Sequence, residues 1–261
     1  MNYLQKNKMN LFEDTEGLNT YLTVTEALVI VDRISFIYKF LKKNLWLDLC
    51  CGKGMSALLL KFKKNNTYIG IDLIHQNCEI TKNISQARVI CGDVHSLPFK
   101  ENMFDTITLS AAIYYLDRNR LIPEIYRVLK KNGILIFDTS NSTLPGFNFA
   151  RESKDYFSAK DWIEFISSKG FYVNCYEGSQ KFQGNKTHIL IQVLKNILKK
   201  FFFKIEFFRN KLRNVSIKYK DKIYFDKNYL YKHLDLKKEW SKIDQNNLSK
   251  SLVLYFVCKK V

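Results

Sequence analysis

The sequence lacks the cysteine and histidine spacings that mark zinc or redox sites. Its 6 cysteines include no C-x-x-C pair and no paired Cys/His motif. Several of them lie inside apolar stretches such as "RVICGD" and "YFVCKK", where a thiol is normally buried and reduced. We therefore expect free thiols in a reducing compartment and no metal site.

Long apolar runs are absent as well. The opening "MNYLQKNKMN" has no apolar core of the kind that a signal peptide needs, and no stretch approaches the ~18 residues that cross a bilayer. We expect a soluble, cytoplasmic protein without a transmembrane segment. The sequence indicates nothing about the oligomeric state.

Acidic residues are few beside basic ones, with 25 Asp and Glu against 42 Lys and Arg and a net charge of +17. Such an excess is typical of proteins that meet nucleic acid, an anionic membrane or an acidic substrate. Arg, which makes bidentate contacts to phosphates and bases, is nevertheless scarce beside Lys. A low-GC genome imposes the same Lys-rich composition, so charge alone identifies no partner.

What the chain does have is a regular alternation of strand-like and helix-like segments. Apolar stretches such as "LWLDL", "YIGIDL", "FDTITLS" and "GILIFDT" are separated by helical patterns, predicted near residues 55–64, 76–84 and 118–131. This alternation predicts an α/β fold, a doubly wound and mostly parallel sheet of seven strands.

Two regions flank this core. Apolar residues recur at helical spacing over residues 24–43, after the capping-box pattern "TVTE". The alternation breaks between residues 179 and 250, where basic and aromatic residues at helical spacing over residues 198–213 predict an amphipathic helix. We expect an N-terminal helical segment over the active site (1–44), a core (45–178), an inserted substrate cap (179–250) and a final core strand (251–261). That helix closes over the substrate or, alternatively, lies on an anionic membrane.

The stretch "LWLDLCCGKG" ends a buried strand and begins a helix. Glycines there let the backbone approach a ligand, and the helix start offers free N–H groups. Asp48 precedes this turn, while Asp72 and Asp93 end the next two strands. The carboxyl ends of parallel strands share one edge, where ligands bind in open α/β sheets. The three carboxylates therefore indicate a ligand site.

Two ligands fit this pattern. "GKGMSA" matches the dinucleotide pattern G-x-G-x-x-A, with Asp72 downstream. Asp48 beside the turn would repel a pyrophosphate, whereas the cationic amino and sulfonium groups of S-adenosylmethionine would be attracted. The charge pattern therefore favours S-adenosylmethionine.

The motifs resemble those of class I S-adenosylmethionine-dependent methyltransferases, especially the small group similar to ubiquinone and menaquinone biosynthesis methyltransferases. The resemblance rests on "LDLCCGKG", "GIDL", "GDVHSLPF", "FDTITLSAAIYYL" and "IYRVLKKNGILIF", in this order. It implies a Rossmann-like fold, methyl transfer and S-adenosylmethionine as cofactor. It also implies that the last strand, "SLVLYFVCKK", runs antiparallel beside "FYVNCYEG". The residues that it assigns to the cofactor are Asp48, Cys50, Gly52 and Gly54 at the methionine end, Asp72 and Leu73 at the ribose, Asp93 and Val94 at the adenine, and Ser110.

Cys50 departs from the family pattern because it replaces the first glycine of the turn. We expect a small residue to serve there, at a position that does not require positive φ. A redox or metal role for Cys50 and Cys51 is disfavoured.

No catalytic residue is fixed by the sequence. Methyl transfer needs a general base only where the acceptor must lose a proton. The side chains that could supply one are Tyr114, Tyr115, His95, His188 and His233.

We expect a small-molecule or sugar acceptor, methylated on oxygen or nitrogen. In composition the chain resembles methyltransferases that modify bacterial surface polysaccharide or capsule, on a sugar hydroxyl or a phosphoramidate, and its charge suits a phosphorylated acceptor. An RNA methyltransferase is the alternative, supported by charge and by Lys interleaved with aromatics, although "SAAIYY" lacks the N-P-P-Y type of motif. A protein that binds the cofactor without catalysis is a further alternative.

Overall fold

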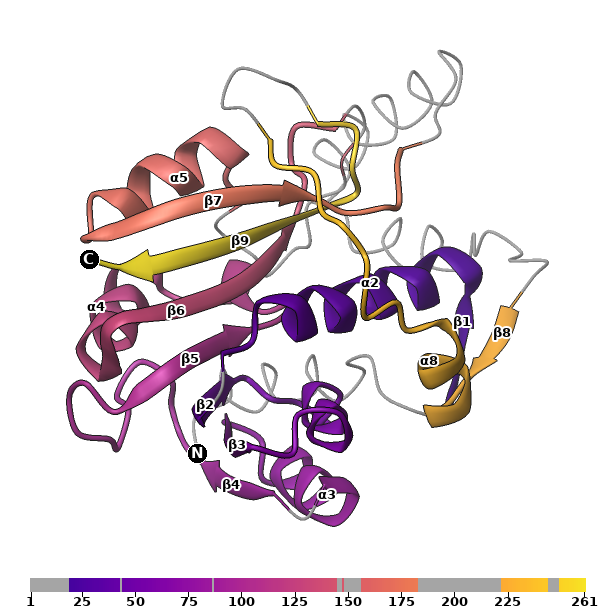
Figure 1. The fold of residues 1–261 in the computed structure, drawn as a ribbon, viewed down its shortest axis with the longest axis horizontal. Helices are drawn as coiled ribbons and strands as arrows, with labels where there is room; N and C mark the ends of the chain where they lie inside the picture. The colour runs from indigo at the N-terminus through magenta and orange to yellow at the C-terminus, as the bar shows by residue number, and fades with distance from the viewer. Residues whose placement is uncertain are drawn as a thin grey trace, which may run out of the picture.

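The computed structural model describes residues 19–42, 44–85, 87–144, 147, 156–182, 222–243 and 249–261. Seven strands form one sheet in the order β4-β3-β2-β5-β6-β9-β7 (Figure 1). Their bounds are β2 Asn44–Leu49, β3 Asn66–Asp72, β4 Arg88–Cys91, β5 Phe104–Leu109, β6 Leu129–Ser140, β7 Phe171–Glu177 and β9 Val253–Lys260. Strands β2 to β6 pair in parallel, and β9 lies antiparallel between β6 and β7. The predicted α/β sheet, including the neighbouring positions of β7 and β9, is confirmed.

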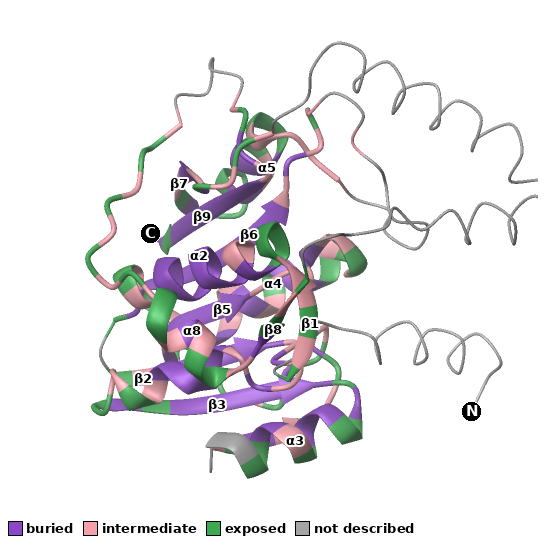
Figure 2. Cartoon of the chain, turned by 90° about the vertical axis from the view of Figure 1, so that its right-hand side faces the viewer, coloured by how far each residue is buried: buried purple, intermediate pink, exposed green. Residues whose placement is uncertain are grey.

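Helices cover both faces of this sheet, as the right-handed β-α-β connections require. The helical elements are α2 Val24–Phe40, η1 Ser56–Lys61, α3 His75–Ser85, η2 Ile113–Tyr115, α4 Arg118–Val128, α5 Ala159–Ser167 and α8 Lys227–His233. Helices α4 and α5 pack on one face, in a core that includes Trp162, while α2, η1 and α8 pack on the other. The strands between them are buried (Figure 2).

Helix α2 begins where the sequence predicts it. Thr23 and Glu26 form the expected capping box, each side chain accepting the other's backbone N–H. The helix then contacts residues on both sides of the undescribed part of the insertion. Asp32 accepts hydrogen bonds from the backbone N–H and the hydroxyl of Ser179, and it pairs with Lys238. The short strands β1 (Thr20–Thr23) and β8 (Lys222–Phe225) pair antiparallel beside it. The described parts of the N-terminal segment and of the insertion therefore contact each other through α2 and β1.

Two predicted boundaries were wrong. The helix expected at residues 55–64 is the shorter 3₁₀-helix η1, closed by a hydrogen bond from Phe62 N–H to Leu59 O at 2.9 Å. The helix expected to reach residue 131 ends at Val128, because β6 already begins at Leu129. Strand β6 carries an irregularity there, with Asn132 at φ 62, a conformation that Asn tolerates better than most residues. The amphipathic helix predicted at residues 198–213 lies outside the described residues.

Phe36 joins α2 to both the sheet and the insertion. Its ring is fully buried and lies 4.8 Å from the rings of both Trp240 and Tyr255, measured between centroids. We expect Phe36→Ala to lower the free energy of unfolding by about 3–5 kcal/mol, because truncation leaves a cavity among aromatic side chains. Urea titration measures this loss. Tyr172→Ala is the control, since that side chain is 61% exposed and its removal should cost less than about 0.5 kcal/mol.

Candidate functional site

The turn after β2 has the backbone of a ligand-binding loop. Cys50, Gly52 and Gly54 all adopt positive φ, at 51°, 52° and 79°. Gly54 could not carry a side chain, because a Cβ there would lie 2.9 Å from the Thr81 methyl group. Thr81, on α3, also donates to Gly52 O at 2.8 Å, so that helix braces the turn from behind. The expectation that Cys50 needs no positive φ is therefore wrong: this cysteine occupies a glycine-like conformation.

Asp72 fixes the turn against the end of β3. One carboxylate oxygen accepts the Gly52 N–H at 2.8 Å, and the other accepts the Ile74 N–H at 2.9 Å and the Asn77 amide at 3.2 Å. Leu73, the next residue, is 65% exposed although it is a large apolar side chain. An apolar side chain left in solvent between strand ends offers a surface to a flat ring. This arrangement fits the nucleoside half of the expected cofactor.

Asp48 has different surroundings from those that its charge suggested. Its carboxylate is buried and accepts hydrogen bonds from Thr108 Oγ1 at 2.5 Å and Tyr68 Oη at 2.9 Å. Burial raises the pKa of Asp48 to about 6, and these hydrogen bonds oppose the rise. The side chain thus supports the strand ends from inside the sheet. The interpretation that it presents its charge to a cationic ligand is corrected accordingly.

The two adjacent thiols are protonated. Burial raises the pKa of Cys50 and of Cys51 well above the usual thiol range, and the nearby carboxylates of Asp48 and Asp72 add to the effect. A thiol needs its thiolate form to ligate a metal or to react. Within the ranges that the structure describes, no group of three or more His, Cys, Asp or Glu side chains could hold a metal ion.

An ion pair that the sequence analysis missed lies near the carboxyl ends of β5 and β6. Arg33 Nε lies 3.1 Å from Asp138 Oδ2, with both side chains nearly buried. Asp138 Oδ1 also accepts the Ala111 N–H at 3.2 Å, beside Ser110 at the end of β5. Ala111 has φ 51°, so Asp138 helps to hold a strained turn. The signal was available, since Asp138 lies near the carboxyl end of the apolar stretch "GILIFDT".

Aromatic rings gather beside this turn. Tyr114 stacks on Tyr156 with centroids 5.2 Å apart and contacts the ring of Tyr115 at 4.6 Å. Phe147 lies 4.8 Å from Tyr156. Tyr115 is 37% exposed. Of the proposed general bases, these two tyrosines alone lie next to the end of β5 among the described residues.

The histidines have other positions. Both ring nitrogens of His95 are engaged, Nδ1 with Asp93 and Nε2 with the Asp117 N–H, so its lone pair is not available to an acceptor. His233 lies on α8, where its ring stacks on Tyr229. His188 lies outside the described residues. Val94 is buried below Asp93.

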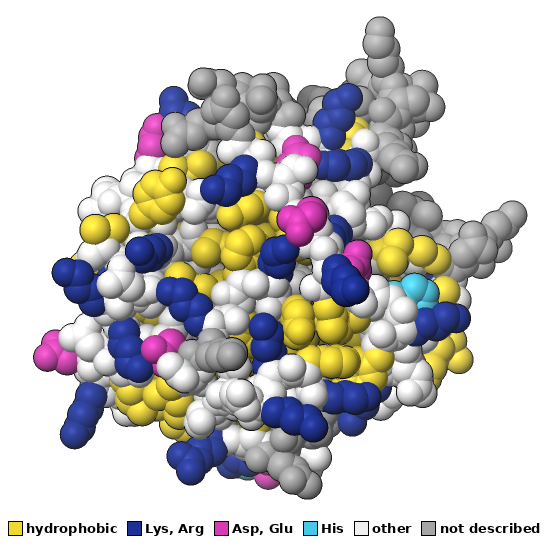
Figure 3. Space-filling model, viewed as in Figure 1, with side chains coloured by type: hydrophobic (Ala, Val, Ile, Leu, Met, Phe, Trp, Pro, Cys, Tyr) yellow, Lys and Arg dark blue, Asp and Glu magenta, His cyan; other side chains and the backbone are white. Residues whose placement is uncertain are grey.

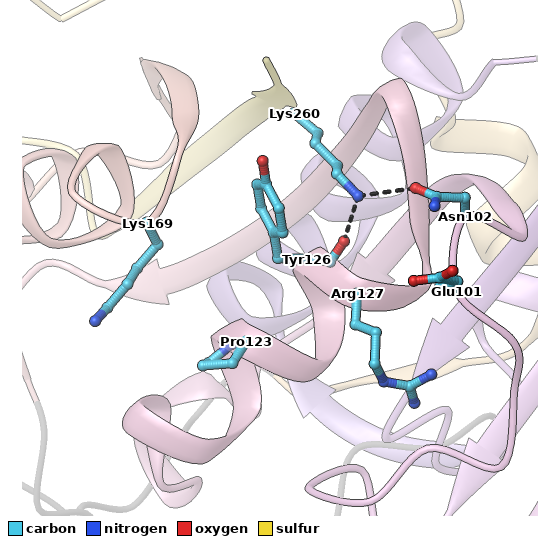
Figure 4. A pocket seen from close by; sticks show the side chains of 7 residues that line it. All are labelled: Glu101, Asn102, Pro123, Tyr126, Arg127, Lys169 and Lys260. Atoms are coloured by element: carbon cyan, nitrogen blue, oxygen red, sulfur yellow. Dashed lines mark hydrogen bonds between the residues drawn. The ribbon is translucent and has the colours of Figure 1, made fainter.

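A cavity of about 420 Å³ lies elsewhere (Figure 4). It is lined by Glu101, Asn102, Pro123, Tyr126, Arg127, Lys169 and Lys260. These residues precede β5, β6 and β7 or end the antiparallel β9, so the cavity opens at the amino edge of the parallel strands. Lys260 Nζ donates to Tyr126 O at 2.7 Å and Asn102 Oδ1 at 3.0 Å and thus caps the end of α4. This cavity is separate from the site at the carboxyl edge.

The comparisons with known proteins agree with the observed fold. The strand order and the helices on both faces define a Rossmann-like α/β class. Residues 47–137 match the family model described as a methyltransferase domain. This part of the chain is a class I S-adenosylmethionine-dependent methyltransferase domain, whose family binds S-adenosylmethionine.

The curated relatives match over part of their length. The demethylmenaquinone methyltransferase of Thermotoga maritima is 36% identical over 124 residues, which is 46% of this chain and 53% of that protein. Its counterpart from Staphylococcus carnosus is 28% identical over 146 residues, 53% of this chain and 61% of that protein. The chain thus spans little more than half the length of the curated relatives that it matches.

Solved structures support the fold. A methyltransferase from Thermotoga maritima, described as a possible histamine N-methyltransferase, aligns with a TM-score of 0.57 at 14% identity, over 99% of this chain and 96% of that one. A methyltransferase from Archaeoglobus fulgidus aligns with a TM-score of 0.56 at 16% identity, over 99% and 100%. At these identities the likeness shows the fold alone.

The buried carboxyl of Asp48 makes stability depend on pH. Because its folded pKa is raised, its stabilising contribution is present below the unfolded pKa of 3.8 and is lost as pH rises through about 6. Asn at this position does not titrate. We expect the free energy of unfolding of the wild type to fall relative to Asp48→Asn by roughly 2–3 kcal/mol between pH 4 and pH 7.5. Denaturant titrations across this pH range measure the difference. If the free energies of unfolding of the two proteins change with pH in parallel, the raised pKa of Asp48 is contradicted.

The positive φ of Cys50 makes a second prediction. Cys50→Gly and Cys50→Ala both remove the sulfur, but only Gly relieves the left-handed backbone, so the Gly variant should be more stable by about 1 kcal/mol. The same pair at Cys51, where φ is not positive, is the control, and there Ala should be the more stable. If the Ala variant is the more stable one at both positions, the backbone of Cys50 is not strained.

Proposed function

We propose that this protein transfers a methyl group from S-adenosylmethionine to a small-molecule acceptor. The observation that carries the proposal is the arrangement at the carboxyl ends of β2 and β3, where Asp72 holds the positive-φ glycine turn next to the exposed Leu73. The cofactor, when bound, supplies a methyl group on a positively charged sulfur, and the acceptor displaces that sulfur in line. The protein's main task is to hold the two reactants in this geometry.

The chain's own residues divide this task. The turn and Asp72 hold the nucleoside, and Leu73 gives its base an apolar surface. The rings of Tyr114, Tyr115 and Tyr156 form a wall beside Ser110 that orients the acceptor and excludes water. A Tyr114 or Tyr115 hydroxyl hydrogen-bonds an acceptor hydroxyl and guides the departing proton.

The narrower proposal is a sugar or phosphorylated acceptor, of the kind found in surface polysaccharide. Its support is the net charge of +17, which favours an anionic ligand. On the face drawn in Figure 3, the described Lys and Arg side chains are scattered between apolar patches rather than gathered into one stripe. That distribution suits a compact anion better than a nucleic-acid backbone, which needs a continuous basic track. Within the described ranges, no helix is both long and apolar enough to span a membrane.

A screen of metabolite pools with methyl-labelled S-adenosylmethionine tests the proposal. We expect label in a small-molecule fraction, at a rate that changes little between 50 and 200 mM salt because a small acceptor neutralises few charges. An RNA substrate would instead lose ~10³-fold in affinity over that range. Asp72→Ala should weaken binding of S-adenosylhomocysteine about 10- to 100-fold, through lost hydrogen bonds to a carboxylate.

Asp105→Ala is the matched control for this experiment. Asp105 also lies on a central strand, but near the amino edge, where it pairs with Lys130 at 3.0 Å. Its removal should leave cofactor affinity unchanged. Labelled nucleosides in RNA digests would show that the acceptor is RNA and would overturn the proposal of a small molecule. If the protein binds the cofactor but labels nothing, it is a binding protein and not an enzyme.

A further inference from the structure

Asp93 and Leu73 follow neighbouring strands, Leu73 directly after β3 and Asp93 two residues after β4. The Gly92 N–H donates to Asp72 O at 2.9 Å, which continues the pairing of β3 with β4 to the residue before Asp93. The Asp93 side chain is 49% exposed, and Leu73 is 65% exposed. A flat base lying on Leu73 would therefore have a carboxylate at its edge.

His95 determines which oxygen of Asp93 is available. Its backbone N–H donates to Asp93 Oδ1 at 2.9 Å, and its ring Nδ1 lies 2.7 Å from the same oxygen. Among the described residues, Asp93 Oδ2 makes no hydrogen bond. One oxygen is thus held twice by the same residue, which leaves the second for a ligand.

The His95 ring is itself held from the other side. Its Nε2 accepts the backbone N–H of Asp117 at 3.0 Å, and Asp117 caps the start of α4. Because Nε2 accepts a hydrogen bond there, the proton is assigned to Nδ1, which donates it to Asp93. The His95 side chain is only 15% exposed, so it bridges β4 and α4 in one orientation.

This bridge keeps Asp93 ionised. Burial opposes the charge, but hydrogen bonds from the His95 N–H and ring outweigh it and hold the pKa of Asp93 below its usual value. An ionised carboxylate only accepts hydrogen bonds. It therefore suits the exocyclic amino group of adenine and repels the oxygen that hypoxanthine carries at the same position.

The family resemblance already assigns Asp93 to the adenine. We propose that His95 is the positioning residue for this contact: it holds Asp93 so that Oδ2 is left to accept a hydrogen bond from the amino group of adenine, and it thereby sets base specificity. The inference rests on the proposed function, in that a nucleoside cofactor binds at these strand ends. It gives His95 a role other than general base. The role is read from ligand choice and does not require turnover.

The test compares S-adenosylhomocysteine with its deaminated analogue, S-inosylhomocysteine, by calorimetry. The wild type should prefer the adenine compound about 10- to 100-fold, the range for one hydrogen bond to a charged group. His95→Phe keeps a ring between β4 and α4 but removes both nitrogens, and should reduce this preference to within about threefold, mainly by weakening the adenine compound. His95→Asn, whose amide can replace Nδ1–H, should restore most of the preference.

Two controls separate positioning from folding. His75→Phe changes a histidine that is 74% exposed on α3 and should leave the preference unchanged. Asp93→Asn should abolish it. If His95→Phe weakens both compounds equally, or keeps the wild-type preference, the role of His95 is refuted. If the wild type binds neither compound, the proposed function fails, and this inference fails with it.

Discussion

The hydrogen bonds of the Asp72 carboxylate are the interactions on which the candidate site after β2 and β3 depends. The carboxylate joins the turn after β2 to the end of β3 by accepting the Gly52 N–H, while its other oxygen holds the first residues leading into α3. The parallel ladder between β2 and β3 brings Gly52 and Asp72 to the same edge, so strand register and ligand site are set together. Helix α3 in turn supports the turn through Thr81, which packs against Gly54. Loss of this one carboxylate would affect both the shape of the turn and its ligand.

The ends of β5 and β6 are held by a different carboxylate, that of Asp138. Asp138 accepts hydrogen bonds from Arg33 on α2 and from the Ala111 N–H, and so ties the N-terminal helix to the ends of β5 and β6. A buried ion pair contributes little net stability, but removing one partner leaves an uncompensated charge, so its value lies in fixing a geometry. The helix that carries Arg33 also contacts the insertion through Asp32. Substrate-side elements far apart in sequence are thereby attached to the same helix.

Several groups that look reactive in the sequence serve to hold others in place. The Cys50 and Cys51 thiols are kept protonated by burial, and the Asp48 carboxyl supports the sheet from inside. His95 spends both ring nitrogens on Asp93 and Asp117. The exposed groups at these strand ends include the Leu73 side chain, the Asp93 carboxylate and the ring of Tyr115. Such a site binds and orients, which is what methyl transfer from an already activated donor asks of a protein.

The sequence by itself determined the α/β class and the mostly parallel sheet, because strands that alternate with helices are joined by crossover connections. It also placed Asp72 and Asp93 at one edge, since Asp72 ends β3 and Asp93 follows β4 by two residues. The local capping box set the start of α2. Only the tertiary structure decided that Cys50 takes a left-handed backbone, that Asp48 faces inward and that Arg33 meets Asp138. These features depend on side-chain direction and on contacts between residues up to 105 positions apart. Local periodicity carries no information about either.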